Sequence, residues 1–322
     1  MKNHKFLEMP VLLLAMAAIL TFSPNAGLAK QEQQGLSEGL DQAPRTAVIS
    51  AFGAELEAFK AQATIQKTVV LNGRSVYIGV LSGHKVVLTL SGISMVNAAM
   101  VTQALIDNFR IERIVFSGIA GGVNPNLSIG DVVIPVRWAE YQENLFARET
   151  APEVYDPPSW FQPILPNFGM MYPDTVGITN VNGPPDQETE TLWFPVDSKM
   201  LAVAQQVAGN VELEQCTQQG ICLSEEPLIQ VGGNGVSGPT FVDNAEYRQY
   251  VWTVWTADAL DMESAAVAHV ATVNDVPFIV FRSLSDLAGG GAGENELEVF
   301  FQLAANNSAR VMLAFINALQ GK

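Results

Sequence analysis

The sequence has few of the side chains on which metal and redox chemistry usually depends. Its 322 residues include only two cysteines and three histidines. The cysteines, Cys216 and Cys222, lack Cys-x-x-Cys spacing, and no third cysteine could complete a zinc site. His269 lies in an apolar stretch and is interpreted as a core or interface residue. We therefore expect neither a metal ion nor a cofactor.

Positive charge is also scarce. Lysine and arginine together number 17 against 33 acidic residues, which gives a formal net charge of −16. Because such a surface repels phosphate backbones, and no basic stripe is present, nucleic acid is excluded as a partner. Hydrophobic residues make up 48% of the chain and charged residues only 16%, so the chain can bury a sizeable core and is not intrinsically disordered.

The most apolar segment lies at the N-terminus. Two lysines precede the apolar run Val11–Phe22, and Gly27-Leu-Ala29 places small residues where a cleavage site needs them. This order is typical of a secretory signal peptide, here residues 1–29. We expect a flexible tail over 30–44 and a periplasmic or secreted protein that does not associate with membranes after cleavage. No other segment is expected to cross a bilayer.

Export also bears on the two cysteines. In an oxidising compartment, Cys216 and Cys222 predict a disulfide that closes a tight loop, with Gly220 between them to permit the turn. A loop this short gains only about 2 kcal/mol from the crosslink. The disulfide is therefore interpreted as a local pin in an exposed loop, without a redox function.

Apolar runs alternate with stretches of helical periodicity along the rest of the chain. Strands are predicted at 46–50, 68–71, 75–81, 85–90, 113–117, 131–138, 228–231, 259–262 and 277–284, and helices at 55–61, 95–109, 198–208, 244–251, 264–274 and 294–319. This alternation predicts an α/β fold, with a single domain over 45–322 and a central mixed, twisted β-sheet flanked by helices. Residues 147–195, rich in proline and aromatic residues, are predicted to form a long irregular insertion with one short helix.

Four short stretches that follow predicted strands carry the chemistry. They are Ile49–Glu55, Ser91–Ile93, Asp261–Ser264 and Ser283–Asp286. Three of them contain a carboxylate that stands at or after a strand end, namely Glu55, Glu263 and Asp286. Each acid alone could be a helix or loop cap. Because ligands bind at the carboxyl ends of strands in open α/β sheets, their joint occurrence favours a single acid–base site.

The same stretches resemble the nucleoside phosphorylase/nucleosidase superfamily, and most of all its bacterial 5′-methylthioadenosine/S-adenosylhomocysteine nucleosidases. The resemblance covers about 47–141 and 231–319. Its further motifs are Ser117-Gly-Ile-Ala-Gly-Gly122, Ile129-Gly-Asp-Val-Val-Ile134, Ser237-Gly-Pro-Thr-Phe-Val242, Leu260-Asp-Met-Glu-Ser-Ala-Ala266 and Arg282-Ser-Leu-Ser-Asp286. It implies a nucleoside phosphorylase-like domain that acts on a purine nucleoside.

The resemblance also implies the roles of individual residues. Asp286 protonates N7 of the leaving purine, and Glu55 activates the attacking water; both are the catalytic residues. The substrate-binding residues are Ser91, Gly92, Ile93, Phe241, Met262, Glu263 and Ser285. Among these, Phe241 stacks on the base, while Met262 and Glu263 hold the ribose. An acid that serves as proton donor must keep its proton near neutral pH, so burial should raise the pKa of Asp286.

The expected reaction is hydrolysis of the N-glycosidic bond of 5′-methylthioadenosine, S-adenosylhomocysteine or an adenosine-like nucleoside to free base and a ribose moiety. A phosphate-dependent phosphorylase is the alternative, but the first loop has no arginine to bind phosphate and carries Glu55 instead. Arg282 is interpreted as a structural ion pair. A second alternative is a non-catalytic nucleoside-binding or storage protein. The resemblance further implies a homo-oligomer. The insertion 147–195 is interpreted as a lid or subunit interface near the site, with packing over its own domain as the alternative.

Overall fold

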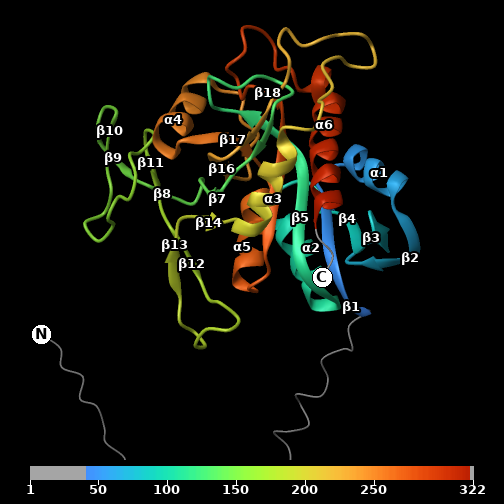
Figure 1. The fold of residues 1–322 in the computed structure, drawn as a ribbon. Coiled ribbons are helices and arrows are strands. Elements are labelled where there is room, and N and C mark those ends of the chain that lie inside the picture. The colour runs from blue at the N-terminus through green and yellow to red at the C-terminus, as the bar shows by residue number, and fades with distance from the viewer. Residues whose placement is uncertain (1–40, 320–322) are drawn as a thin grey trace, which may run out of the picture. The chain divides into compact units, whose positions relative to one another are not determined.

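The computed structural model describes residues 41–319 (Figure 1). The predicted signal peptide and residues 30–40 of the predicted tail lie outside the described residues. Residues 41–44 were also predicted to belong to the tail, but they form the start of the first strand, β1 (Asp41–Ser50). Asp41 pairs with Phe109 in the sheet, and its carboxylate binds the guanidinium of Arg45. This local pairing extends β1 beyond the boundary that hydrophobicity predicts.

The fold is an α/β domain with a mixed 12-stranded sheet, as predicted (Figure 1). The strands of the main sheet are β1, β2 (Thr64–Leu71), β3 (Arg74–Leu81), β4 (His84–Leu90), β5 (Phe109–Gly122), β6 (Val132–Ile134), β7 (Arg137–Glu140), β14 (Phe194–Pro195), β15 (Ile229–Val231), β16 (Asn234–Ser237), β17 (Ala257–Asp261) and β18 (Phe278–Asp286). The order β14-β7-β16-β17-β5-β1-β4-β3-β2 forms its main path, and β18 pairs with β5 and β6. The neighbours β4, β1, β5 and β18 run parallel, so their carboxyl ends share one edge.

Helices cover both faces of this sheet. They are α1 (Gly53–Gln62), α2 (Met95–Asn108), α3 (Ser198–Ala208), α4 (Ala245–Trp255), α5 (Ser264–Val273) and α6 (Leu297–Ala318). In β1, Ala47 and Ile49 pack with α2 and α5, whereas Val48 packs on the other face with α1 and α6. Because side chains alternate along a strand, a strand buried on both faces needs an unbroken apolar run. For this reason the central strands could be predicted from their unbroken apolar runs.

Two strand predictions require correction. The run 131–138 is two strands, β6 and β7, separated at Pro135. Proline has no N–H to donate to a ladder, and the chain changes neighbours there: β6 pairs with β15 and β18, while β7 pairs with β16 and β14. The strand β16 was not predicted, because Asn234-Gly-Val-Ser237 has only one apolar side chain.

The insertion 147–195 contains no helix, contrary to the prediction. Besides β14, which joins the main sheet, its short strands are β9 (Arg148–Ala151), β10 (Val154–Asp156), β11 (Met171–Pro173), β12 (Val176–Ile178) and β13 (Thr189–Thr191). Strand β11 pairs with β8 (Asn144–Phe146) just before the insertion. Three of its aromatic residues pack on helices of the same chain: Phe168 lies against Tyr247, Trp193 against Trp255, and Phe194 is stacked on His269. These contacts attach the insertion to α4 and α5, whereas the β9–β10 hairpin extends away from them (Figure 1).

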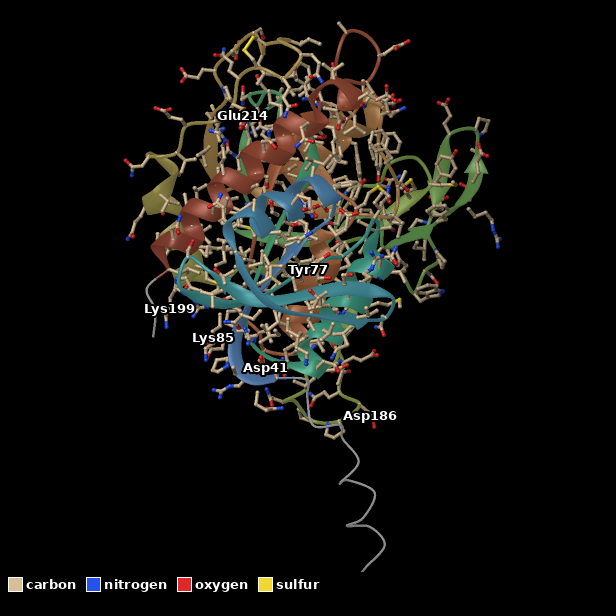
Figure 2. The ribbon with its side chains drawn as sticks, turned by 90° about the vertical axis from the view of Figure 1, so that its right-hand side faces the viewer. Asp41, Tyr77, Lys85, Asp186, Lys199 and Glu214 are labelled. Carbon is tan, nitrogen blue, oxygen red and sulfur yellow. A yellow bond between two sulfur atoms is a disulfide. The ribbon has the colours of Figure 1, made fainter. Side chains whose placement is uncertain are left out.

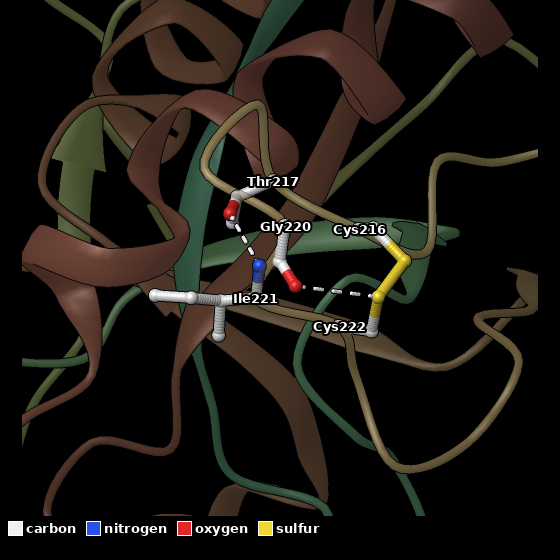
Figure 3. Close-up of a disulfide and its surroundings, with 5 residues drawn as sticks. All are labelled: Cys216, Thr217, Gly220, Ile221 and Cys222. Carbon is white, nitrogen blue, oxygen red and sulfur yellow. Dashed lines mark hydrogen bonds between the residues drawn. A yellow bond between two sulfur atoms is a disulfide. The ribbon is translucent and has the colours of Figure 1, made fainter.

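The predicted disulfide is confirmed: Cys216 and Cys222 are bonded in the loop between α3 and β15 (Figure 3). In the turn that it closes, Ile221 donates its N–H to Thr217 Oγ1, and Gly220 has a φ of +84°. Just before the bridge stands Glu214, which is labelled in Figure 2. It forms an ion pair with Arg310 of α6 and accepts a hydrogen bond from Asn306. The loop is thus fastened to the outer side of α6.

Within residues 41–319, one helix is long and apolar enough to span a membrane by length and composition. It is α6, with a mean hydropathy of 1.2 over 18 residues. The expectation that no segment beyond the N-terminus would pass this test was wrong. Its apolar side chains, among them Val311, Met312 and Phe315, are buried against the sheet, as in the core helix of a globular domain.

Candidate active site

A cavity of about 210 Å³ lies at the carboxyl edge of β5, β17 and β18. Most of its wall is apolar. The residues that line it are Phe52, Ile93, Ile119, Ala120, Gly121, Thr240, Phe241, Val242, Leu260, Asp261, Met262, Glu263, Ser285, Asp286, Leu297 and Phe301. The four stretches that the sequence singles out therefore converge here, because each follows the end of a strand or begins a helix at this edge.

Asp286 is the last residue of β18 and is only 2% exposed. One carboxylate oxygen, Oδ1, accepts the N–H of Ala288 at 2.8 Å, and the other lies 2.9 Å from the hydroxyl of Ser285. Burial raises the pKa of Asp286 above its usual range, and the two hydrogen bonds only partly oppose this. The structure thus fixes the orientation of a carboxyl group that tends to keep its proton, as predicted for a general acid.

Glu263 stands between β17 and α5 and faces the same cavity. Its Oε1 accepts the N–H of Ser94 at 2.7 Å, which connects it to the loop after β4. Burial and the adjacent carboxylate of Asp261 raise the pKa of Glu263 to about 7, against the opposing charge of Arg282. Met262 lines the cavity beside it. A carboxyl group so placed can accept hydrogen bonds from the hydroxyls of a polar ligand.

Arg282 lies on β18, four residues before Asp286, and is fully buried. Its Nε forms an ion pair with Asp261 at 2.6 Å, so the predicted structural pair exists. Its two terminal nitrogens, Nη1 and Nη2, have no hydrogen-bond partner within the described chain, although Glu263 lies 3.8 Å from Nη2. Gly118 makes room for the guanidinium, because a Cβ there would lie 1.1 Å from Nη1. Arg282 therefore offers unused donors as well as a structural contact.

Glu55, in the first turn of α1, is fully buried and does not itself line the cavity. Its Oε2 accepts the N–H of Phe52 at 3.4 Å, whereas Oε1 has no partner within residues 41–319. Burial raises the pKa of Glu55 to about 8, although the charge of Arg282 acts in the opposite direction. Within the described residues, the free Glu55 oxygen is thus an unused acceptor, and the terminal nitrogens of Arg282 are unused donors.

The remaining predicted residues are only partly brought together. Phe241 lines the cavity and is 52% exposed, and Ile93 lines it from the loop after β4. Ser91 and Gly92 do not line the cavity, and their binding of substrate stays a prediction. The hydroxyl of Ser91 donates to the backbone carbonyl of Gly92 at 2.9 Å, so its hydrogen is already used in a hydrogen bond. The two residues shape the loop that carries Ile93.

Sequence reasoning missed the apolar residues that α1 and α6 contribute. Phe52 and Phe301 meet edge to face, with ring centroids 5.1 Å apart, and Leu297 lies beside them. The position of Phe52, three residues before Glu55, was a usable signal. The sequence gave no such signal for the start of α6. The Gly-rich segment between Asp286 and Leu297 can take many paths, so the position of α6 relative to the site could not be predicted.

The insertion does not cover this cavity, since none of residues 147–195 lines it. The structure therefore gives no support to a lid over the site of the same chain, and a subunit interface stays a prediction. Phe168, Trp193 and Phe194 of the insertion instead pack on α4 and α5.

Comparison with known proteins agrees with this geometry. The chain is 29% identical over 272 residues to a 5′-methylthioadenosine/S-adenosylhomocysteine nucleosidase of Tolumonas auensis, covering 84% of this chain and 98% of that protein. A Bacillus cereus protein of the same name is 28% identical and is covered completely, with 86% of this chain. The solved nucleosidase of Neisseria meningitidis, in complex with methylthio-immucillin-A, is 26% identical with a TM-score of 0.63, over 85% of this chain and 99% of that one. A family model described as the phosphorylase superfamily matches residues 45–317, and the chain belongs to this family.

Proposed function

We propose that the protein hydrolyses the N-glycosidic bond of a purine nucleoside of the 5′-methylthioadenosine, S-adenosylhomocysteine or adenosine type. The observation that carries this proposal is the pairing of two buried acids at one site. Asp286 faces the cavity with a raised pKa, and Glu55 has a carboxyl oxygen without a partner near the unused donors of Arg282. The relatives from Tolumonas auensis and Bacillus cereus are both named as nucleosidases, which supports the same reaction for this protein.

Asp286 acts on the leaving group. The purine stacks on Phe241, and Asp286 transfers its proton to N7 of the ring. The electron pair of the bond between C1′ and N9 then moves into a base that is already protonated, which makes it a better leaving group. Positive charge develops on the ribose, as in glycoside hydrolysis. The Ser285 hydroxyl and the Ala288 N–H hold the carboxyl group in place and stabilise its anionic form after transfer.

Glu55, Arg282 and Glu263 act on the other reactants. Glu263 accepts hydrogen bonds from the ribose hydroxyls. A water molecule held by Glu55 and Arg282 adds its oxygen to C1′ and gives its proton to Glu55. Glu55 performs this step in its ionised form. Because burial raises the pKa of Glu55 to about 8, we expect this form to be the minor one at neutral pH and the step to become faster as pH rises toward 8.

Water suits this place better than phosphate. The free nitrogens of Arg282 lie among Glu55, Glu263 and Asp261, and the guanidinium is already paired with Asp261. A phosphate dianion beside three carboxyl groups would be repelled by each that is ionised, and burial would add a desolvation cost.

The test is product identification. The purified protein is incubated with methylthioadenosine, S-adenosylhomocysteine, adenosine, inosine and uridine, with and without inorganic phosphate. We expect free adenine and a free 5-substituted ribose in phosphate-free buffer. A ribose-1-phosphate product that forms only with phosphate would make the protein a phosphorylase, and no base release from any of the five would leave the nucleoside-binding alternative.

We further propose that the protein is exported and acts as a homo-oligomer. The predicted signal peptide and the Cys216–Cys222 disulfide support export. Exposed apolar residues beside the cavity support assembly: Ile93, Val96 and Met100 are 51%, 71% and 53% exposed. N-terminal sequencing of the exported protein tests the first proposal, with a mature chain expected to begin near residue 30. Light scattering on that protein tests the second, and a monomer at micromolar concentration would contradict it.

A further inference from the structure

Arg74 places a positive charge beside the site that the proposed reaction does not use. It is the first residue of β3, which runs antiparallel to β4 with Tyr77 opposite Leu88. The same register places Arg74 next to Ser91, at the edge where the substrate binds. These outer strands face the viewer in Figure 2, where Tyr77 is labelled. A Cβ on Gly92 would lie 2.2 Å from Nη2 and 2.9 Å from Nη1 of Arg74, so the guanidinium lies directly over Gly92.

Within residues 41–319, the guanidinium of Arg74 forms no hydrogen bond and no ion pair, although the chain has a net charge of −16. Arg45 and Arg282, by contrast, are each paired with an aspartate. Arg74 is half-buried, and with Val76 of its own strand and Val101 of α2 it lines a small cavity between β3 and α2. A guanidinium whose donors are free is suited to bind a carboxylate.

A short path connects the expected ribose to this charge. Glu263, which is placed to hold the ribose, accepts the N–H of Ser94. Ser94 is two residues from Gly92, a distance of roughly 7 Å along an extended chain. Ile93 lies between them, lines the cavity and is 51% exposed. A substituent that leaves the ribose and passes over Ile93 would therefore reach Arg74 within a few bonds.

We propose that Arg74 binds a carboxylate at the end of the 5′-substituent, and that the protein therefore prefers purine nucleosides whose 5′-thioether ends in a carboxylate. This inference rests on the proposed function. By this reasoning S-adenosylhomocysteine, which carries such a carboxylate, is a better substrate than methylthioadenosine. Arg74 is less suited to bind a phosphate co-substrate. Such a nucleophile must approach C1′ from the side of Glu55 and Arg282, which are completely buried, whereas Arg74 is only half-buried.

The test uses two adenosine thioethers of equal length. One carries a 2-carboxyethylthio group at C5′ and the other a propylthio group, so they differ only in the terminal carboxylate. The variants are Arg74→Met, which keeps the apolar stem, and Arg74→Lys, which keeps the charge. We expect Arg74→Met to lower kcat/KM for the carboxylate substrate roughly 10- to 100-fold, the range of a charge-assisted hydrogen bond, mainly through KM. The propylthio substrate should change less than about 2-fold, and Arg74→Lys should restore part of the loss.

Other results would overturn the inference. Equal losses for both substrates, together with a smaller oligomer, would assign Arg74 to a carboxylate of a second copy of the chain. Unchanged kinetics for the carboxylate substrate would leave Arg74 without a ligand. If the wild-type protein hydrolyses neither thioether, the proposed function fails. Titration calorimetry with the same two compounds then tests Arg74 alone. Weaker binding of only the carboxylate compound to Arg74→Met supports the inference, and equal binding of that compound to the wild-type protein and the variant contradicts it.

Discussion

The inner and outer parts of the site are built on different principles. The inner part consists of Glu55, Glu263, Arg282 and Asp286, and it is polar, buried and attached to the central strands or the helix starts that follow them. The outer part consists of Phe52, Ile93, Leu297, Phe301 and Arg74, and it is largely apolar, more exposed and carried by helix starts, loops and an outer strand. Burial of the inner side chains shifts their pKa values and fixes their positions, and catalysis needs both. The outer side chains are more exposed and can vary in sequence, which suits residues that determine substrate preference.

This difference predicts that changes in the inner part affect turnover or folding, whereas changes in the outer part affect substrate preference. The largest effect is expected for Asp286→Asn. It removes the proton donor but keeps an oxygen for the Ala288 N–H, so kcat should fall by a factor of about 10² or more. Ser285→Ala is the matched control and should cost less, since it removes only a neighbouring hydroxyl. Steady-state kinetics measure kcat of both variants. Near-normal turnover of Asp286→Asn would show that Asp286 only caps the loop and is not the proton donor.

A second prediction concerns the pH dependence of stability. The pKa of Glu55 rises from 4.5 to about 8 on folding, so between these values the folded chain holds a proton that the unfolded chain has lost. The stability that Glu55 contributes is present below pH 4.5 and is lost as pH rises through 8. Glu55→Gln should therefore gain stability over wild type between pH 4 and pH 9, on the order of 5 kcal/mol.

Urea unfolding at several pH values measures this difference. Glu57→Gln is the control, because Glu57 lies on the same helix but its side chain is 67% exposed. It should leave the pH dependence unchanged. Parallel curves for Glu55→Gln and wild type would show that Glu55 is ionised in the folded protein.

A third prediction tests how rigid the inner part is. Gly118→Ala would place a methyl group 1.1 Å from Nη1 of Arg282, which is buried and cannot withdraw. Overpacking of this kind typically costs about 1–3 kcal/mol, and displacement of Arg282 should also lower kcat. Gly209→Ala is the matched control, because no atom lies within 4 Å of its added methyl group and its φ is −75°. Denaturant unfolding compares the two, and equal stabilities would mean that Arg282 has room to move.

The same inner and outer division explains what could be predicted from the sequence. Glu55 and Asp286 stand after and at the ends of the parallel strands β1 and β18, and Glu263 follows β17, which runs antiparallel to β5. Each acid is therefore marked in the sequence by the apolar strand before it. Arg74 could not be found, because its proximity to Gly92 depends on the pairing of β3 with β4 across a turn. The position of the insertion could not be predicted for a related reason. Its aromatic residues indicated packing, but only tertiary structure could show that three of them lie on α4 and α5, away from the cavity.

The smallest effect is expected in the outer part, at Phe301. Its ring meets Phe52 at one side of the cavity, where it can shield an apolar 5′-substituent from water. Phe301→Ala should raise KM for methylthioadenosine by about 5- to 10-fold, since loss of apolar contact with a small group costs about 1–2 kcal/mol. The KM for adenosine, which lacks the methylthio group, should change less, and kcat should stay similar for both because Asp286 and Glu55 are untouched. Phe300→Ala, the neighbouring phenylalanine that does not line the cavity, provides the control. A loss of kcat in Phe301→Ala as large as that in Asp286→Asn would contradict the separation of catalysis from substrate choice.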